Sequence, residues 1–161
     1  MNSMIQMDTD VQDASSHVCF FDIYDKHIFK QPARTTWING WKVEYMAIAQ
    51  PETAHLTPIV IIGGAFQNFN SYKYCVEQLF RAGPIILIDM PSMGANQQMT
   101  NVETGESAGT LELHDLGQML GDWLDIVGLD KVSVMGMSLG SVVASCLADQ
   151  RPELIDRMIL M

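Results

Sequence analysis

The residue types best suited to chemistry lie in one short run, Gly136-Met137-Ser138-Leu139-Gly140. A serine on a tight turn from a strand into a helix has its hydroxyl lifted clear of the sheet, on a strained backbone. Glycine fits Gly136 and Gly140 because strand and helix approach closely there. The beginning of the helix also directs backbone N–H groups toward the serine, where they stabilise an oxyanion. The pattern indicates Ser138 as a nucleophile for acyl transfer.

The motif is informative only in the right setting, because Gly-x-Ser-x-Gly alone occurs by chance in roughly one chain in twenty of this length. It needs a strand before it and a helix after it. Residues 132–135, Val-Ser-Val-Met, are typical of a buried strand. Residues 139–150 are small and apolar enough to predict a helix that ends before Pro152. We therefore interpret the motif as a strand–turn–helix.

The wider sequence supplies a sheet for that strand. Residues 36–38 and 41–47, joined by Asn39-Gly40, predict a β-hairpin with a type I′ turn. We expect an α/β fold, with a mostly parallel sheet and helices on both faces, because strand and helix signals alternate after the hairpin. The further strands are predicted at 59–62, 85–88 and 158–161, with helices at 71–81 (Ser71 as N-cap) and about 110–127 (Thr110 as N-cap, Gly128 as the stop).

Composition limits the classes of partner. With 161 residues, of which 48% are hydrophobic and 17% charged, the chain predicts one globular domain. A net charge of −10 disfavours nucleic acid and anionic lipid as partners. No apolar run is long enough to span a membrane, and the first residues lack a signal-peptide pattern, so we expect a cytoplasmic protein. Residues 1–34 are predicted to be an N-terminal extension, and residues 35–161 the folded domain.

Three further segments fit one family in the order expected of it. Gly63-Gly64-Ala65-Phe66 follows the first apolar strand, Asp89-Met90-Pro91-Ser92-Met93-Gly94 follows the second, and Pro152-Glu153 precedes the last. With the serine motif, these segments make residues 36–161 resemble the N-terminal portion of the α/β-hydrolase superfamily. Members commonly have a His-Gly or Gly-Gly turn, an Asp-x-Pro-Gly-x-Gly loop and a Pro-Glu pair at these places.

The resemblance implies roles for individual residues. Ser138 would be the nucleophile, and the backbone N–H groups of Ala65 and Leu139 would form the oxyanion hole. Gly64 would allow the backbone to approach the site closely. The reaction implied, acyl transfer through a serine acyl-enzyme, uses neither a metal ion nor an organic cofactor.

The same resemblance implies a binding pocket. Phe66 and Met137, together with Leu139, would line an apolar site for a small-molecule acyl substrate. Asp89 resembles the structural aspartate of the family's loop and not its catalytic acid. The cysteines and histidines are scattered without metal-ligand spacing, so we expect reduced thiols and no metal site.

Two features depart from the family pattern. Gly63 stands where many members have histidine. Parts of the superfamily tolerate that change, including acyltransferases that make hydroxyacyl lipid precursors, whose Asn-Gly-Ala turn is similar. More importantly, the acid and the histidine of the triad follow the serine in this family, and no residue after Ser138 is a histidine. Asp149 and Asp156 do not occupy the expected position. His114 is expected to be solvated or to cap a helix.

These observations leave three functions open. The first is a serine hydrolase acting on an ester or thioester, present here without its acid and histidine. The second is an acyltransferase on the same scaffold, and the third is a non-catalytic binding module. The oligomeric state is left open. Because a sheet that stops at its fourth crossover leaves an apolar edge, we expect the 161-residue chain alone to be poorly soluble or molten, and inactive on p-nitrophenyl esters.

Overall fold

The computed structural model of the chain describes residues 20–25 and 27–161. Residues 1–19, the greater part of the predicted N-terminal extension, lie outside the described residues. The described residues before 35 contact the sheet: β1 (Asp22–Ile23) pairs in parallel with the end of β3, and the Arg34 guanidinium bonds to Asp22 at 2.9 Å. The division of the chain at residue 35 stays a prediction.

A seven-stranded sheet forms the centre of the molecule. Its order is β1-β3-β5-β4-β6-β7, with β2 also pairing with β3. The strands β4, β5, β6 and β7 run parallel to one another, and β3 is antiparallel to β5. The prediction of a mostly parallel sheet is therefore confirmed. The strands of this sheet after β1 are β2 (Arg34–Ile38), β3 (Trp41–Ala49), β4 (Ile59–Ile62), β5 (Ile85–Asp89), β6 (Val132–Gly136) and β7 (Ile155–Leu160).

The predicted hairpin is formed by β2 and β3. The two strands pair from Arg34–Tyr45 to Ile38–Trp41, and Asn39 and Gly40 turn the chain with φ values of 48° and 78°. These positive values are those that a type I′ turn requires. The hairpin extends the parallel strands on the β5 side of the sheet.

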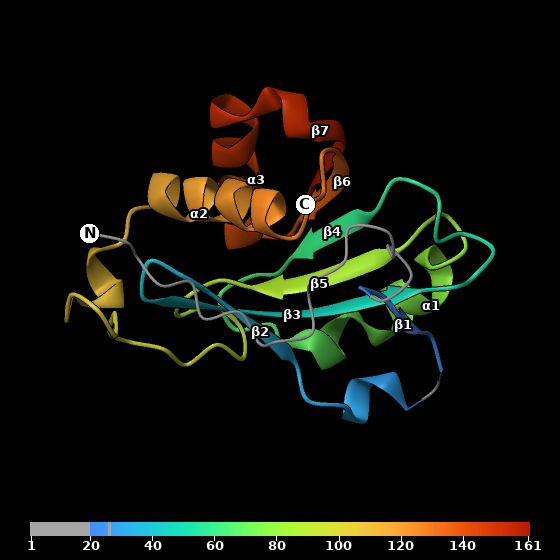
Figure 1. Cartoon of the computed structure of the whole chain (residues 1–161), viewed down its shortest axis with the longest axis horizontal. Helices are drawn as coiled ribbons and strands as arrows, with labels where there is room; N and C mark the ends of the chain where they lie inside the picture. The colour runs from blue at the N-terminus through green and yellow to red at the C-terminus, as the bar shows by residue number, and fades with distance from the viewer. Residues whose placement is uncertain (1–19, 26) are drawn as a thin grey trace.

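Three α-helices cover the two faces of the sheet. Helices α2 (Leu113–Ile126) and α3 (Leu139–Gln150) lie side by side on one face, and α1 (Lys73–Leu79) lies on the other (Figure 1). Short 3₁₀ segments are found at Ile28–Lys30, Phe69–Tyr72, Ala108–Thr110 and Pro152–Leu154. Among the described residues, none of the helices is both long and apolar enough to cross a bilayer.

Both predicted N-caps are wrong. Ser71 lies inside the 3₁₀ turn Phe69–Tyr72, and α1 begins only after Tyr72. Thr110 ends another 3₁₀ turn, and α2 begins after Glu112, whose backbone N–H bonds to Asp115 at 2.8 Å. In each case a 3₁₀ turn delays the helix, which is a common feature of helix beginnings. The end of α2 is as predicted, because Gly128 follows it with a φ of 74°.

Side chains on the two faces form separate cores. The larger core contains the apolar face of α2, with Leu120, Trp123 and Leu124 fully buried, together with Val134 of β6. The smaller core joins Ile61 and Leu87 of the opposite face to the α1 segment. Helix α3 stays slim because of its small residues, and Gly117 of α2 lies against it, where an added Cβ would be 2.6 Å from the Cβ of Cys146.

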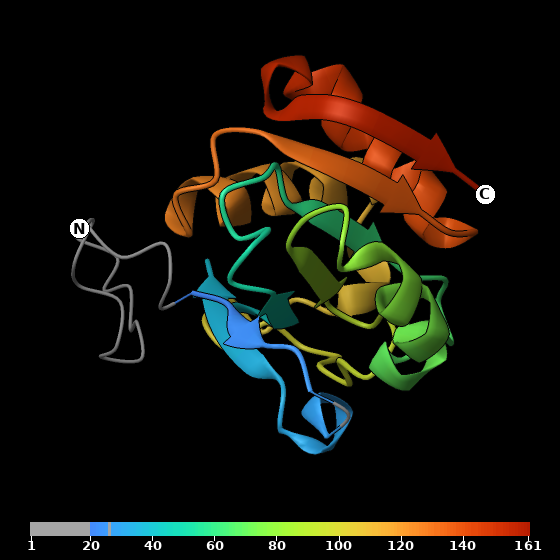
Figure 2. The same ribbon diagram turned by 90° about the vertical axis from the view of Figure 1, so that its right-hand side faces the viewer.

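Strand β7 begins three residues earlier than predicted and is the least covered strand of the parallel set. Asp156 and Arg157 lie inside it, because a strand at the edge of a sheet can direct polar side chains to water. Asp156 therefore belongs to the strand and does not precede it. In Figure 2, β6 and β7 run side by side toward the C mark, and none of the described strands lies beyond β7. The last residues of the chain are exposed, with Met158, Ile159, Leu160 and Met161 at 40 to 59%.

Candidate active site

Ser138 lies on the turn between β6 and α3, at the C-terminal edge of the parallel strands. Its backbone has φ 53° and ψ −119°, a region that residues with a Cβ rarely adopt. Gly136 ends β6, Leu139 begins α3, and the Ser138 side chain is exposed. The sequence motif is thus a strand–turn–helix, with its serine raised above the edge of the sheet.

The two glycines of the motif allow this close turn. A Cβ on Gly136 would lie 2.6 Å from the Gly140 carbonyl oxygen, and one on Gly140 would lie 2.2 Å from the Ile62 carbonyl oxygen. Both contacts are with backbone, which cannot swing away as a side chain can. Any larger residue would push α3 away from β6 or β4.

Hydrogen bonds hold the turn in place. The Met137 amide donates to the Ile62 carbonyl oxygen at 2.9 Å, and the Ser138 amide donates to the Met161 carbonyl oxygen at 2.6 Å. The Ser141 hydroxyl lies 2.8 Å from the carbonyl oxygens of both Gly136 and Met161. The end of β7 is therefore tied directly to the serine turn.

The loop after β4 approaches Ser138 from the neighbouring strand. A Cβ on Gly64 would lie 3.3 Å from the Cβ of Ser138, so the Gly64 backbone lies close to the Ser138 side chain. Neither the Ala65 amide nor the Leu139 amide donates a hydrogen bond to any group in the described part of the chain. Two N–H groups, one in the loop after β4 and one on the residue that follows Ser138, are consequently free to bind a ligand, as the expected oxyanion hole would need.

These segments enclose a shallow, mostly apolar pocket of about 370 Å³. The structure brings five of the predicted site residues together in it, namely Gly64, Ala65, Phe66, Met137 and Ser138. The expectation that the Leu139 side chain lines this pocket is wrong. As the first residue of α3, Leu139 turns its side chain into the larger core. Phe66 does border the pocket, but its ring is 99% exposed.

Gln67 and Tyr72 form a hydrogen-bonded pair that fixes the loop after β4. Gln67 accepts two hydrogen bonds at Oε1, from the Gly64 amide at 2.7 Å and from the Tyr72 hydroxyl at 2.9 Å. Burial raises the pKa of Tyr72 to about 12, and the negative charge of Asp89 adds to the shift. The Tyr72 hydroxyl therefore stays protonated as a donor near neutral pH.

Tyr72 also explains the glycine at position 63. A Cβ on Gly63 would lie 1.9 Å from the Tyr72 hydroxyl oxygen. The tyrosine hydroxyl occupies the space that a side chain at position 63 would fill. In this chain, glycine replaces the family's histidine at position 63 because the Tyr72 hydroxyl leaves no space for a side chain there.

Asp89, at the end of β5, fixes the loop that follows this strand. Its carboxylate is 2% exposed and accepts the Ala95 amide at 2.7 Å. Burial raises the pKa of Asp89 to about 7; the Ala95 bond opposes the shift and the Glu44 charge adds to it. Asp89 lies outside the Ser138 pocket, in keeping with a structural part.

The sequence of this region matches a known family. Residues 57–161 match the family described as alpha/beta hydrolase fold, which is well over half of the chain. The chain belongs to the alpha/beta hydrolase fold family. Among curated protein sequences, none matches this chain.

Solved structures agree on the fold. A hydrolase from Pseudomonas aeruginosa PA01 superposes with a TM-score of 0.67 at 19% identity, over 80% of this chain and 44% of that one. MGS-M2, an alpha/beta hydrolase enzyme from a Medee basin deep-sea metagenome library, gives a TM-score of 0.66 at 19% identity, over 79% and 43%. A structure from a study of carboxylesterases of Nitrososphaera gargenis gives 0.62 at 20% identity, over 80% and 44%. The superposed part of this chain thus covers less than half the length of each of these structures.

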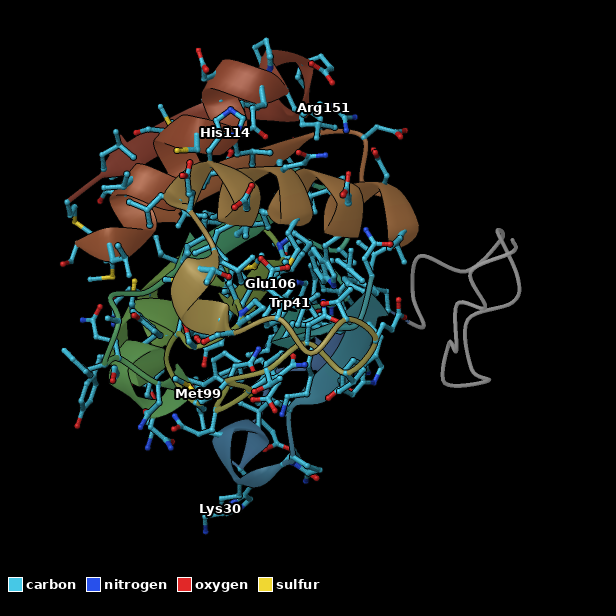
Figure 3. The ribbon with its side chains drawn as sticks, turned by 90° about the vertical axis from the view of Figure 1, so that its left-hand side faces the viewer. Lys30, Trp41, Met99, Glu106, His114 and Arg151 are labelled. Atoms are coloured by element: carbon cyan, nitrogen blue, oxygen red, sulfur yellow. The ribbon has the colours of Figure 1, made fainter. Side chains whose placement is uncertain are left out.

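Of the serine, acid and histidine that the resemblance implies, the described residues bring only Ser138 to the pocket. No histidine of residues 20–25 and 27–161 lines it. His114 is exposed on the second residue of α2, where its carbonyl oxygen accepts the Gln150 side chain at 2.9 Å (Figure 3). Asp149 is exposed within α3. Cys75 and Cys146 are free, and no cluster of metal-ligating side chains forms among the described residues.

Two residues important to the geometry were missed by sequence reasoning. In the sequence, Gln67 lies in a polar loop, and Tyr72 lies at the beginning of a weakly predicted helix. Nothing in their spacing distinguishes them from solvent-exposed residues. One signal was available. A glycine where relatives have histidine leaves a space beside a buried strand, and some other side chain has to fill that space.

Proposed function

We propose that the complete protein is a serine hydrolase that cleaves an ester or thioester bond through an acyl-enzyme on Ser138. The observation that carries this proposal is the exposed Ser138 side chain, held on a strained turn beside two unengaged amides. Strain of this kind costs about 1–3 kcal/mol and is retained where the surrounding structure over-determines it. A turn with a purely structural role has no need of it.

The proposed reaction follows from this geometry. Ser138 Oγ attacks the carbonyl carbon of the substrate, and the carbonyl oxygen takes up the negative charge. The Ala65 and Leu139 amides donate to that oxygen, which stabilises the tetrahedral intermediate. The bond to the leaving group then breaks, leaving the acyl group on Ser138, and water releases it as the carboxylic acid.

This reaction also requires a base that takes the Ser138 proton and returns it to the leaving group. Without such a base the serine is a weak nucleophile, and the oxyanion hole alone gives only residual rate. The proposal therefore places a histidine and its carboxylate partner in chain outside the 161 residues. They would have to reach the pocket beside Met161, which borders it.

Labelling with a fluorophosphonate tests this proposal, because the reagent modifies only an activated serine. We expect the complete protein to be labelled on the peptide that contains Ser138, with the label lost in Ser138→Ala. The control is Ser145→Ala, an exposed serine one helical turn or more further along α3, which should be labelled as the unaltered protein is. Absence of labelling in the complete, folded protein would contradict the proposal and favour the non-catalytic binding module.

An acyltransferase is the second candidate, supported by the Gly63-Gly64-Ala65 turn, with Tyr72 in place of the histidine side chain. In that case an alcohol other than water accepts the acyl group from Ser138. Product analysis in the presence of a small alcohol separates the two. A hydrolase gives mainly the free acid, and an acyltransferase gives mainly the new ester.

A further inference from the structure

The orientation of the Gln67 side chain is fixed by its partners. Both the Gly64 amide and the Tyr72 hydroxyl approach one atom of the carboxamide, at 2.7 and 2.9 Å. A backbone N–H is always a donor, so the atom facing Gly64 must be the carbonyl oxygen. If the carboxamide were turned over, its NH₂ group would face the Gly64 N–H, donor against donor. The NH₂ group must therefore point away from these partners.

Gln67 borders the pocket of Ser138 and has a side-chain NH₂ group without a hydrogen-bond partner among the described residues. The would-be Cβ of Gly64 is 3.1 Å from Gln67 Oε1 and 3.3 Å from Ser138 Cβ, so both side chains lie on one side of Gly64. The remaining side chains of the pocket, those of Ala65, Phe66, Met137 and Met161, offer no N–H or O–H donor.

A fixed donor in an apolar pocket selects for an acceptor. A site built to hydrogen-bond a substrate group discriminates against an analogue that lacks this group, because its own polar atom is then left unpaired. The Ala65 and Leu139 amides already serve the scissile carbonyl oxygen in the proposed reaction. The Gln67 donor is thus left for a second oxygen of the substrate.

We propose that Gln67 is a specificity-determining residue, whose NH₂ group binds an oxygen in the acyl chain close to the scissile carbonyl. The substrate class is then an ester or thioester of an oxygen-substituted acid, carrying an ether, hydroxyl or keto oxygen near the carbonyl. The proposal rests on the proposed acyl transfer at Ser138. It specifies which part of the substrate the pocket recognises, namely the acyl chain.

Matched substrates test the proposal. The pairs are p-nitrophenyl methoxyacetate against butanoate, and 3-methoxypropanoate against pentanoate, in which an ether oxygen replaces one CH₂ group. For each pair the ratio of kcat/KM is measured in the complete protein and in Gln67→Glu. The variant keeps an acceptor for Gly64 and Tyr72 but loses the donor. The intrinsic reactivity of each ester cancels between the two proteins.

For at least one pair, we expect the kcat/KM ratio of ether ester to all-carbon ester to fall by about tenfold in Gln67→Glu. The cause is the loss of one hydrogen bond, together with repulsion between the new carboxylate oxygen and the ether oxygen. Gln78→Glu makes the same change on the exposed side of α1, and should leave both ratios unchanged. If Gln67 serves only to hold the loop, both esters slow equally and the ratios stay constant. That result overturns the proposal while Ser138-dependent turnover still stands.

A binding measurement decides the matter even if the protein turns over no ester. The Gln67 side-chain NH₂ gives its own pair of ¹H–¹⁵N resonances, assigned by their absence in Gln67→Glu. In Ser138→Ala protein, these resonances should shift on titration with ethyl methoxyacetate or ethyl 3-methoxypropanoate, and much less with ethyl butanoate or ethyl pentanoate. Equal response to ether and all-carbon esters contradicts the recognition of an acyl oxygen, whatever the outcome for catalysis.

Discussion

The Gly94 amide donates a hydrogen bond to the Ala65 carbonyl oxygen at 3.1 Å, which joins the loop after β5 to the loop after β4. Gly94 has a φ of 57°, and a Cβ there would lie 2.3 Å from the carboxylate oxygens of Asp89. The Ala95 amide donates to the same carboxylate. Asp89 thus fixes the Gly94-Ala95 segment, and this segment in turn fixes Ala65. The Ala65 amide is the group that is proposed to contact the substrate.

Replacing Asp89 with asparagine should change how stability depends on pH. Burial raises its pKa from 3.8 to about 7, so the folded state binds the proton more tightly than the unfolded state. The stability that protonated Asp89 contributes is complete below pH 4 and is lost as pH rises toward 7. Relative to the unaltered protein, Asp89→Asn should gain roughly 2–4 kcal/mol in the free energy of unfolding between pH 4 and pH 8.

Urea unfolding of both proteins across this pH range measures the difference. The control is Asp130→Asn, which replaces an exposed carboxyl in the turn before β6. Its stability should follow that of the unaltered protein. A constant difference between Asp89→Asn and the unaltered protein from pH 4 to pH 8 would mean that Asp89 is ionised throughout.

Gly63 and Tyr72 should be coupled in stability. Because a Cβ at position 63 would lie 1.9 Å from the Tyr72 hydroxyl oxygen and 2.9 Å from its ring carbon, Gly63→Ala should cost about 1–3 kcal/mol by overpacking. In a Tyr72→Leu background, which removes both atoms, the same change should cost less. A double-mutant cycle of unfolding free energies gives this coupling directly.

Gly109→Ala is the matched control for position 63. Its Cβ would meet only the Ser107 hydroxyl at 3.5 Å, an ordinary contact, so the change should stay within about 0.5 kcal/mol. If Gly63→Ala costs the same in both backgrounds, Tyr72 does not account for the glycine.

The sequence predicted those parts of the site that depend on local pattern. The strand–turn–helix at Ser138 and the Asn39-Gly40 turn were predictable because each needs particular residue types at consecutive positions. The gathering of Phe66 and Ser138 in one pocket followed from adjacent parallel strands, whose ends meet at one edge of the sheet.

What could not be predicted depends on contacts between distant segments. The Gly94–Ala65 bond and the Gln67–Tyr72 pair join loops whose relative position is set by the whole sheet. The early beginning of β7 was hidden because Asp156 and Arg157 look like loop residues, and only an edge position makes them compatible with a strand. The inward turn of Leu139 depends on how α3 packs against α2, β6 and β4.

The exposed edge of β7 predicts self-association of residues 1–161 produced on their own. Ile159 is 52% exposed on β7, which pairs on one side only with strands of residues 20–25 and 27–161. Unpaired strand edges with apolar side chains template further pairing, and a lysine on the edge discourages it. Ile159→Lys should lower the aggregated fraction seen by size-exclusion chromatography with light scattering.

Val142→Lys is the control for that experiment. It adds the same charge at an apolar side chain that is 43% exposed, but on helix α3. If Val142→Lys lowers aggregation as much as Ile159→Lys does, net charge and not the β7 edge governs association.

The backbone strain at Ser138 should be visible as a preference for glycine. With φ 53° and ψ −119°, any residue with a Cβ is strained there, whereas glycine adopts this region readily. Ser138→Gly should therefore be more stable than Ser138→Ala by about 1 kcal/mol in urea unfolding, although both lack the nucleophile. At Ser145, inside α3, the order should reverse, with alanine about 1 kcal/mol better than glycine. Should alanine be the better residue at both positions, the turn at Ser138 is not strained, and the stored strain that supports the nucleophile assignment is lost.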